Sequence, residues 1–461
     1  MKPKEECGLF GFFDADGHAV SKMIYYGLYA LQHRGQESCG IAVNDGGNVK
    51  VVKDLGLVNE VFNSENITTL KGCIGVGHVR YSAGGNGGLR ENAMPFITRD
   101  LKGSLTMAFN GNVLNARDLR EELEQSGAIF QSTNNAEVVM HMAAHSRARK
   151  NSIEEALLDI MCKLEGAFSM VLMTNRKLIG VRDPQGFRPL VLGKLKNSYV
   201  ICSETAALDV IKAEFVRDIE PGEIVVITKD GIESLKYHKK NKPSLCVFEY
   251  IYFARPDSII DGVSVYKTRV EAGKRLAERC PVPADLVIGV PDSGLNFAIG
   301  YAEKSGIPYG EGFIKNRYTG RTFIKPSQEE REITVGIKLN ALKENVRGKR
   351  VIIIDDSIVR GTTCRGIIRQ LREAGATEVH MRVASPPFLW PCYFGTDIPS
   401  RKELLAVNYT ADQICSEIGA DSLGYLAPAD LKAIGLRKDF GYCDACFTGE
   451  YPVRNDTNRI S

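Results

Sequence analysis

The stretch VIIIDDSIVRGTT, residues 351–363, decides the fold of the second half of the chain. Its β-branched apolar residues, 351–354, are typical of a buried strand in a parallel sheet. Two aspartates end this strand, and a short polar turn leads directly into a helical pattern. In open α/β sheets, ligands bind at the carboxyl ends of strands, where a helix N-terminus offers N–H groups to a phosphate. The stretch therefore predicts a sugar-phosphate site built from Asp355, Asp356, Ser357, Arg360, Gly361, Thr362 and Thr363.

The same stretch has a simpler interpretation, in which a strand, a polar turn and a threonine N-cap serve only the fold. Every α/β protein contains such junctions. The combination here is more specific, because adjacent carboxylates suit ribose hydroxyls or Mg²⁺ and Gly361 lets the backbone approach a ligand closely. We therefore favour the sugar-phosphate interpretation.

The chain divides into two halves of different character. Short β-rich segments with helical stretches near 21–33, 115–126 and 136–149 predict an α+β layered domain in the first half. Residues 236–245, KYHKKNKPSL, are lysine-rich and lack periodicity, which is typical of a linker. After them, apolar strands alternate with helical segments, and this βαβ order predicts a parallel sheet.

Length, composition and charge are those of an ordinary globular protein. With 461 residues, 44% hydrophobic and 25% charged, the chain is too long for one core and predicts two or three domains. The net charge of +3 gives no reason to expect nucleic acid or a membrane as a partner. We find neither an apolar run of transmembrane length nor a signal-peptide segment. We therefore expect a cytoplasmic protein whose twelve cysteines are reduced thiols or metal ligands.

Cys7, in the segment EECGLFGFF, is a candidate nucleophile. A thiolate is the strongest nucleophile among the side chains, but it needs a base. If MKPKEE were removed, Cys7 would carry an α-amine with a pKa of about 8, which could act as that base. Taken alone, Cys7 is better explained as a small buried apolar residue at the start of a strand.

Motifs along nearly the whole chain resemble the amidophosphoribosyltransferase family. They are ECGLFG at 6–11, GLYALQHRGQES at 27–38, GHVRYS at 77–82, NGN at 110–112, EGAFS at 165–169, RDPQGFRPL at 182–190 and the run from SETAALD to EPGE at 203–223. In addition, the 351–363 stretch matches the phosphoribosyl-diphosphate loop of type I phosphoribosyltransferases.

The resemblance implies a fold for each half of the chain. Residues 7–240 would form an α+β N-terminal-nucleophile hydrolase domain with αββα layers, which acts as a glutaminase. Residues 1–6 would be a propeptide, removed by scission between Glu6 and Cys7. Residues 241–461 would form an α/β type I phosphoribosyltransferase domain with a parallel sheet and an iron–sulfur site.

The resemblance also assigns roles in the first domain. Cys7 would attack the glutamine carboxamide, and Asn110 and Gly111 would stabilise the oxyanion, a contribution of roughly 3–4 kcal/mol per donor. Arg80 offers a bidentate fork for the α-carboxylate of glutamine.

Three positions depart from the family pattern, which usually has threonine at Ala83, histidine at Phe109 and aspartate at Asn135. The aspartate meets the positive α-amine of glutamine. Asn135 keeps an acceptor but loses the charge, which weakens this contact by roughly 1–3 kcal/mol. We therefore expect a weak glutamine site, with ammonia a relatively better donor.

In the second domain, GVPDSG at 289–294 also follows a strand, and the resemblance makes Ser293 a magnesium ligand together with Asp355 and Asp356. Residues 313–331, FIKNRYTGRTFIKPSQEER, carry irregularly spaced cations. They read either as a solvated loop or, by resemblance, as a lid over the diphosphate. Lys315 and Lys338 would bind that diphosphate.

Cys443 and Cys446 form a C-x-x-C pair in GYCDACF, which is typical of a metal centre. By spacing alone this pair fits a four-iron cluster, zinc, a redox pair or unrelated buried thiols. The resemblance adds Cys246 and Cys392 and implies one [4Fe–4S] cluster per subunit.

The resemblance predicts an enzyme that joins ammonia from glutamine to 5-phosphoribosyl 1-diphosphate. The products would be 5-phosphoribosylamine, glutamate and diphosphate, in the first step of purine synthesis. One Mg²⁺ per subunit, inhibition by purine nucleotides and a homotetramer are also implied. Two alternatives are an ammonia-dependent enzyme with a vestigial first domain and a non-catalytic, nucleotide-binding relative.

Overall fold

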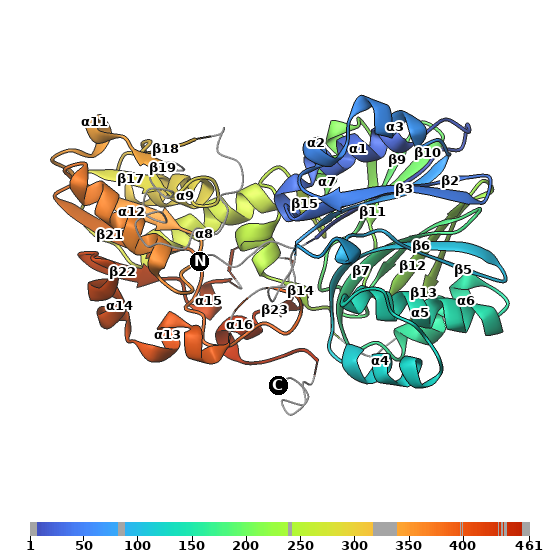
Figure 1. Cartoon of the computed structure of the whole chain (residues 1–461). Helices are drawn as coiled ribbons and strands as arrows, with labels where there is room; N and C mark the ends of the chain where they lie inside the picture. Colours follow the sequence, from blue (N-terminus) through green and yellow to red (C-terminus); the bar gives the residue numbers. More distant parts are fainter. Residues whose placement is uncertain are drawn as a thin grey trace.

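The computed structural model describes residues 7–81, 88–237, 242–316, 339–396, 398, 400–431, 433, 434, 437 and 440–453. These residues form two lobes that lie side by side, one from each half of the chain (Figure 1). In the described part of the chain, no helix is both long and apolar enough to span a membrane.

The first lobe is built from two antiparallel sheets. One sheet contains β1 (Gly8–Phe13), β2 (Ser38–Asp45), β3 (Asn48–Leu55), β4 (Ile74–Arg80), β9 (Val191–Leu195), β10 (Ser198–Cys202) and β11 (Glu214–Asp218), in the order β11-β9-β10-β1-β4-β2-β3. The other contains β5 (Phe96–Asp100), β6 (Gly103–Val113), β7 (Gly166–Met173), β8 (Leu178–Arg182), β12 (Glu223–Thr228) and β13 (Gly231–Lys236), in the order β13-β12-β8-β7-β6-β5.

Helices cover the outer faces of both sheets, so the lobe has four αββα layers (Figure 1). The first sheet carries α1 (Ser21–Ala30), α2 (Val58–Val61), α3 (Ser64–Thr69) and α7 (Thr205–Val210), and the second carries α4 (Ala116–Gln125), α5 (Asn135–Arg149) and α6 (Ile153–Met161). The alternation of side chains in β1 explains this arrangement, because Leu9 faces the other sheet and Phe10 faces α1.

The second lobe contains a parallel sheet of β17 (Leu286–Gly289), β20 (Arg350–Asp355), β21 (Glu378–Val383) and β22 (Ser422–Tyr425), in the order β17-β20-β21-β22. One face packs on α8 (Val265–Arg279) and α9 (Leu295–Ser305), and the other on α12 (Thr362–Glu373) and α14 (Ala411–Ile418). The apolar run of β20 serves both faces, since Ile352 and Ile354 point to α8 and α9 while Val351 and Ile353 point to α12.

Shorter elements complete this lobe: β14 (Leu245–Cys246), β15 (Ile259–Ile260), β16 (Val263–Ser264), β18 (Phe313–Lys315), β19 (Leu339–Ala341), α11 (Lys343–Val346), α13 (Leu405–Asn408), α15 (Pro428–Leu431), β23 (Tyr442–Cys443) and α16 (Ala445–Thr448). The short 3-10 helix η1 (Gln32–Arg34) of the first lobe and the π-helix η3 (Glu249–Phe253) of the second lie near the boundary of the lobes.

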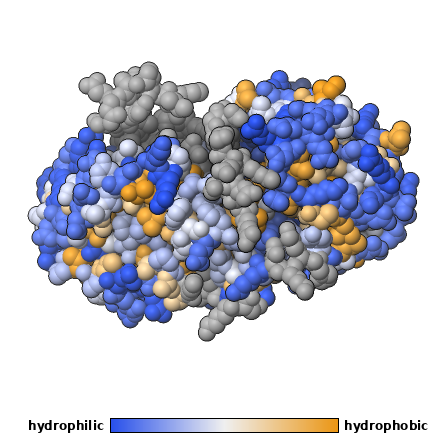
Figure 2. Space-filling model, turned by 90° about the horizontal axis from the view of Figure 1, so that it is seen from below, coloured by the Kyte–Doolittle hydropathy of each residue, from blue (hydrophilic) through white to orange (hydrophobic). Residues whose placement is uncertain are grey.

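The two predicted fold classes are confirmed. The three helical stretches predicted in the first half form as α1, α4 and α5. The predicted domain boundary at residues 240 and 241 lies outside the described residues and stays a prediction. The face of the molecule in Figure 2 is mainly hydrophilic, with hydrophobic side chains in small separate groups.

Candidate active sites

Cys7 lies directly before β1, a central strand of the first sheet. Its Sγ is 3.5 Å from the carbonyl oxygen of Tyr81, and its side chain is half-buried. Since Gly8 pairs with Val79 of β4, the strand register places Cys7 next to Arg80. The guanidinium of Arg80 is buried, with Nη1 3.8 Å from a carboxylate oxygen of Glu37. The structure therefore brings the predicted nucleophile and the predicted carboxylate-binding residue together.

Asn110 lies on β6, in the other sheet, and is completely buried. Neither its Oδ1 nor its Nδ2 has a hydrogen-bond partner among the residues that the structure describes. A buried amide without partners is costly unless a ligand completes it. Gly111 follows with φ +133°, and a Cβ there would lie 1.9 Å from the carbonyl oxygen of Ala167. Only glycine fits this backbone.

His78 ties the strand of Arg80 to the strand of Asn110. Its Nε2 lies 3.0 Å from the carbonyl oxygen of Phe109, so the neutral ring donates a hydrogen bond between the two sheets. Burial lowers the pKa of His78 to about 3, and the nearby charge of Arg80 also lowers it. Phe109 itself is buried and stacks on Phe168 with ring centroids 6.1 Å apart.

Asn135 is the first residue of α5, which Asn134 caps by accepting a hydrogen bond from the N–H of Ala136. The Nδ2 of Asn135 donates to Oδ1 of Asn112 at 3.0 Å, and Nδ2 of Asn112 donates to the carbonyl oxygen of Tyr393 at 2.9 Å. Sequence reasoning missed Asn112. A signal was present, because residues i and i+2 of a strand share a face and Asn110 was already a candidate.

The acidic end of β20 is buried in the second lobe. The hydroxyls of Ser293 and Ser357 each donate to a carboxylate oxygen of Asp356, and the N–H of Asp356 donates to Asp355 at 2.9 Å. Ser293 and the two aspartates thus meet at one sheet edge, although Ser293 and Asp356 are 63 residues apart in the chain. Gly361, with φ +74°, precedes the first residue of α12, Thr362, and Thr363 follows it.

Arg269 is a residue near this edge that sequence reasoning missed. It is buried and donates to the carbonyl oxygens of Tyr250 (2.7 Å) and Ala254 (2.8 Å). Burial lowers its pKa to about 10, and the charge of Asp356 opposes this shift. A charged residue inside a helical pattern looks like a solvated side chain, so the sequence carried no signal for it.

Other predicted cations are paired within the protein. Lys315 forms an ion pair with Asp292, and Arg360 with Glu403. Some predicted positions lie outside the described part of the chain. They are Ala83, Lys338, residues 317–331 of the predicted lid and the six residues before Cys7.

The four predicted cluster cysteines converge in the second lobe. The parallel pairing of β14 with β23 sets Cys246 opposite Cys443, and Cys446 follows on α16. Together with Cys392 they line one pocket, closed by aromatic side chains that include Phe187 and Phe394. Burial raises the pKa values of Cys443 and Cys446 far above the ordinary value, and the neighbouring thiols raise them further.

Matches to known proteins extend over nearly the whole chain. A glutamine amidotransferase domain model matches residues 80–210, and a phosphoribosyl transferase domain model matches residues 272–384. The amidophosphoribosyltransferase of Archaeoglobus fulgidus is 48% identical over 97% of this chain and 98% of its own. That of Methanocaldococcus jannaschii is 48% identical over 98% of this chain and 99% of its own.

Two solved structures resemble the chain along nearly its full length. One is a glutamine phosphoribosylpyrophosphate amidotransferase from Bacillus subtilis, complexed with ADP and GMP, with a TM-score of 0.91 and 44% identity over 98% of both chains. The other is described as the allosteric regulatory enzyme of purine biosynthesis, with a TM-score of 0.92 and 45% identity over 98% of both chains.

Proposed function

This chain belongs to the amidophosphoribosyltransferase family, and we propose that it transfers ammonia from glutamine to 5-phosphoribosyl 1-diphosphate. The products are 5-phosphoribosylamine, glutamate and diphosphate, at the entry to purine biosynthesis. The observation that carries this assignment is 48% identity to family members across both lobes, 97% of the chain. The two candidate sites, one in each lobe, supply the two half-reactions.

In the first lobe, Cys7 acts as the nucleophile once scission after Glu6 has exposed its α-amine as a base. Its thiolate attacks the glutamine carboxamide carbon, and the oxyanion accepts hydrogen bonds from Nδ2 of Asn110 and the N–H of Gly111. Ammonia leaves with the proton that the α-amine took from the thiol, and water then hydrolyses the thioester to glutamate. The orphaned amide of Asn110 supports this role, because the oxyanion supplies the acceptor that it lacks.

Glutamine is held by groups at the edges of this site. Arg80 binds the α-carboxylate, and the buried position of its guanidinium strengthens that contact. Asn135 accepts a hydrogen bond from the α-amine through its Oδ1, while its Nδ2 stays on Asn112.

In the second lobe, the 5-phosphate of the substrate binds at the turn Ser357–Thr363 and at the N-terminus of α12. The backbone N–H groups of this turn and the hydroxyls of Ser357, Thr362 and Thr363 donate to it. We assign the ribose hydroxyls to Asp355 and Asp356. From the sequence we assign the positive charge that faces the phosphates to Lys315, Lys338 and Arg360. Ammonia attacks C1 of the ribose with inversion, and the C1–O bond to the diphosphate breaks.

The acidic edge of β20 fits a magnesium ion. Mg²⁺ prefers carboxylate, hydroxyl and water oxygens, and Asp355, Asp356 and Ser293 offer such atoms within one hydrogen-bonded group. When bound with the substrate, Mg²⁺ neutralises charge on the leaving diphosphate.

The cysteine pocket fits a [4Fe–4S] cluster held by Cys246, Cys392, Cys443 and Cys446. Four adjacent thiols ionise with difficulty without a cation, as the raised pKa values of Cys443 and Cys446 indicate, and a metal centre removes this cost. Both a four-iron cluster and zinc accept four thiolates, and family membership favours the cluster here.

Anaerobically purified protein should therefore absorb near 400 nm and contain about four irons per chain. Colourless protein with stoichiometric zinc would contradict the cluster. From family membership we also propose a cytoplasmic homotetramer that purine nucleotides inhibit; the complex of the Bacillus subtilis relative with ADP and GMP supports the nucleotides.

The proposed reaction is tested by supplying purified protein with glutamine, 5-phosphoribosyl 1-diphosphate and Mg²⁺. We expect equal amounts of glutamate and diphosphate. A protein trimmed to Cys7 that releases no diphosphate with either glutamine or ammonia is not this enzyme.

A second candidate is an enzyme of the same family that favours free ammonia over glutamine. The observation in its favour is the uncharged Asn135 at the α-amine position. Measurement of kcat/KM for both nitrogen donors separates the two, since a low glutamine KM excludes the ammonia-favouring form.

A further inference from the structure

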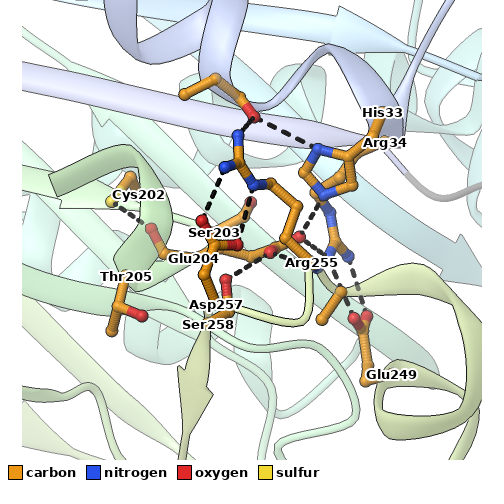
Figure 3. A network of polar contacts seen from close by, with 12 residues as sticks. His33, Arg34, Cys202, Ser203, Glu204, Thr205, Glu249, Arg255, Asp257 and Ser258 are labelled. Carbon is orange, nitrogen blue, oxygen red and sulfur yellow. Dashed lines mark hydrogen bonds and ion pairs between the residues drawn. The ribbon is translucent and has the colours of Figure 1, made fainter. Parts of the chain in front are cut away.

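A buried charge network joins the two lobes (Figure 3), and one of its members contacts Cys7. Arg34 of η1 lies at its centre, with a fully buried side chain. Its Nη1 donates to Oε1 of Glu204 at 2.6 Å, and its Nη1 and Nη2 donate to the two carboxylate oxygens of Glu249 at 3.0 and 2.8 Å. Glu204 follows β10 of the first lobe, whereas Glu249 begins η3 of the second.

The remaining nitrogen of this guanidinium reaches the nucleophile's own residue. Nε of Arg34 donates to the backbone carbonyl oxygen of Cys7 at 3.1 Å. In the proposed reaction the thiol and the basic α-amine are both attached to the Cα of Cys7, the thiol through Cβ. A bond that fixes the carbonyl on that Cα therefore limits the positions of both reacting groups.

The network holds Arg34 in a single orientation. Glu204 is itself fixed, because its Oε2 accepts from the hydroxyl of Ser258 (2.6 Å) and the N–H of Arg255 (2.9 Å), and His33 contacts its Oε1 at 2.8 Å. Burial would raise the pKa of Glu204, but His33 and Arg34 hold it well below the usual range. The carboxylate of Glu204 is thus ionised at neutral pH.

Glu249 supplies the second negative charge. Nη1 of Arg188 lies 3.7 Å from Oε1 of Glu249. The positive charges of Arg34 and Arg188 are thus balanced by the carboxylates of Glu204 and Glu249 inside the protein. Burial would lower the pKa of Arg34, but Glu249 and Glu204 raise it instead. Without Glu249, Arg188 would lose this neighbouring carboxylate, and Arg34 would lose two of its four hydrogen-bond contacts.

We propose that Glu249, a residue of the second lobe, is a positioning residue for glutamine cleavage in the first lobe, acting through Arg34 on the backbone of Cys7. This inference deepens the proposed function and rests on it. It predicts that the glutaminase half-reaction depends on the second lobe through this contact, independently of substrate binding at the sheet edge.

The test compares Glu249→Gln with the wild type in the full chain. We expect kcat with glutamine to fall by roughly ten- to a hundredfold, with a smaller change in KM. Synthesis from ammonia should stay within about twofold, because it does not use Cys7. The rate at which iodoacetamide alkylates Cys7, followed by peptide mass spectrometry, should fall as well, a result that a purely structural role does not predict.

A matched control is Asp261→Asn. Asp261 of the second lobe forms an equally buried bidentate pair with Arg182 of the first, at 2.9 Å for both contacts, and makes no contact with Cys7 among those the structure describes. This variant should lose stability without a selective loss of glutamine use. An equal selective loss in Asp261→Asn would overturn the proposal.

The remaining outcomes are also decisive. An unchanged glutamine kcat or an unchanged alkylation rate in Glu249→Gln refutes the positioning role while leaving the proposed function intact. Wild-type protein without glutamine-dependent synthesis refutes the function itself. If Glu249→Gln also loses ammonia-dependent synthesis, Arg34→Lys becomes the test variant. Lysine keeps the positive charge but cannot make hydrogen bonds to the Cys7 carbonyl and to both carboxylates at once. Full glutamine kcat in Arg34→Lys then contradicts the inference.

Discussion

Asn110 shows how burial can leave the hydrogen-bonding groups of one side chain available to a reaction intermediate. The amide is completely buried on β6, and within the described chain it has no hydrogen-bond partner for either polar atom. Such an amide costs about 1–3 kcal/mol of folding free energy. In the proposed reaction that cost is offset in the transition state, because the oxyanion accepts from a donor that needs no reorganisation.

The variant Asn110→Ala removes this donor. We expect kcat with glutamine to fall by about 10²–10³ with little change in glutamine KM, because the contact forms only with the oxyanion. Synthesis from ammonia should be unchanged and serves as the control. If the variant instead raised glutamine KM and left kcat unchanged, Asn110 would lie outside the oxyanion site.

The variant Asn135→Asp restores a charge at the α-amine position. We expect glutamine KM to fall about fivefold, since a charge-assisted hydrogen bond is worth roughly 1 kcal/mol more than a neutral one. Asn134→Asp is the matched control, because aspartate also caps α5 and adds the same charge one residue away. Equal effects of both variants on KM would show that Asn135 makes no direct contact.

Sequence reasoning reached Cys7, Arg80 and Asn135 through motifs, but it did not reach Asn112 or Glu249. The reason is physical. Asn112 matters through a bond to Tyr393, which is 281 residues away, and Glu249 through contacts with Arg34, 215 residues away. Partners so distant in the chain leave no local pattern, and the only local signal was the i, i+2 spacing of Asn112 from Asn110.

At the scale of elements, the junction from β20 to α12 was predictable because its signals are local. The β-branched run, the acidic strand end and the glycine before a helical pattern all lie within thirteen residues, 351–363. The structure adds one feature, the left-handed conformation of Gly361 at φ +74°. The order of the two sheets in the first lobe was not predictable, because it depends on pairings such as β1 with β10.

The variant Gly361→Ala tests this junction. A Cβ at this φ is strained and would lie 2.8 Å from Cδ2 of Leu405, so the turn that binds the 5-phosphate must shift. We expect the KM for 5-phosphoribosyl 1-diphosphate to rise about tenfold. Gly348→Ala is the matched control, since Gly348 has φ +73° and open space around its Cβ position. Equal KM values for both variants would contradict the phosphate role of the turn.

At the scale of the whole molecule, the two sheets of the first lobe are held together by apolar packing and by a few polar bridges. His78 is one of these bridges, through its hydrogen bond to Phe109. It is buried and neutral, with a pKa of about 3 against about 6.5 in the unfolded chain. Below pH 6.5 the unfolded chain therefore binds a proton that the folded protein does not.

The difference between the folded-state and unfolded-state pKa of His78 changes the free energy of unfolding with pH. Its contribution to stability is fully present above pH 6.5 and is lost as the pH falls toward 3. At pH 5 the loss from His78 is about 2 kcal/mol. We expect His78→Gln to reduce the pH dependence of unfolding between pH 7.5 and 5 by about that amount, measured by urea denaturation. An unchanged dependence in the variant would show that His78 is not the responsible group.

The central claim is that nitrogen released at Cys7 is the nitrogen joined to the ribose in the other lobe. It is tested most directly by supplying trimmed protein with amide-¹⁵N glutamine, 5-phosphoribosyl 1-diphosphate, Mg²⁺ and an equal concentration of unlabelled ammonium at neutral pH. Mass spectrometry of the trapped amino sugar should show ¹⁵N, and Cys7→Ser should abolish this label while leaving the unlabelled product. Product without ¹⁵N in the wild type, or label that survives in Cys7→Ser, would contradict the claim.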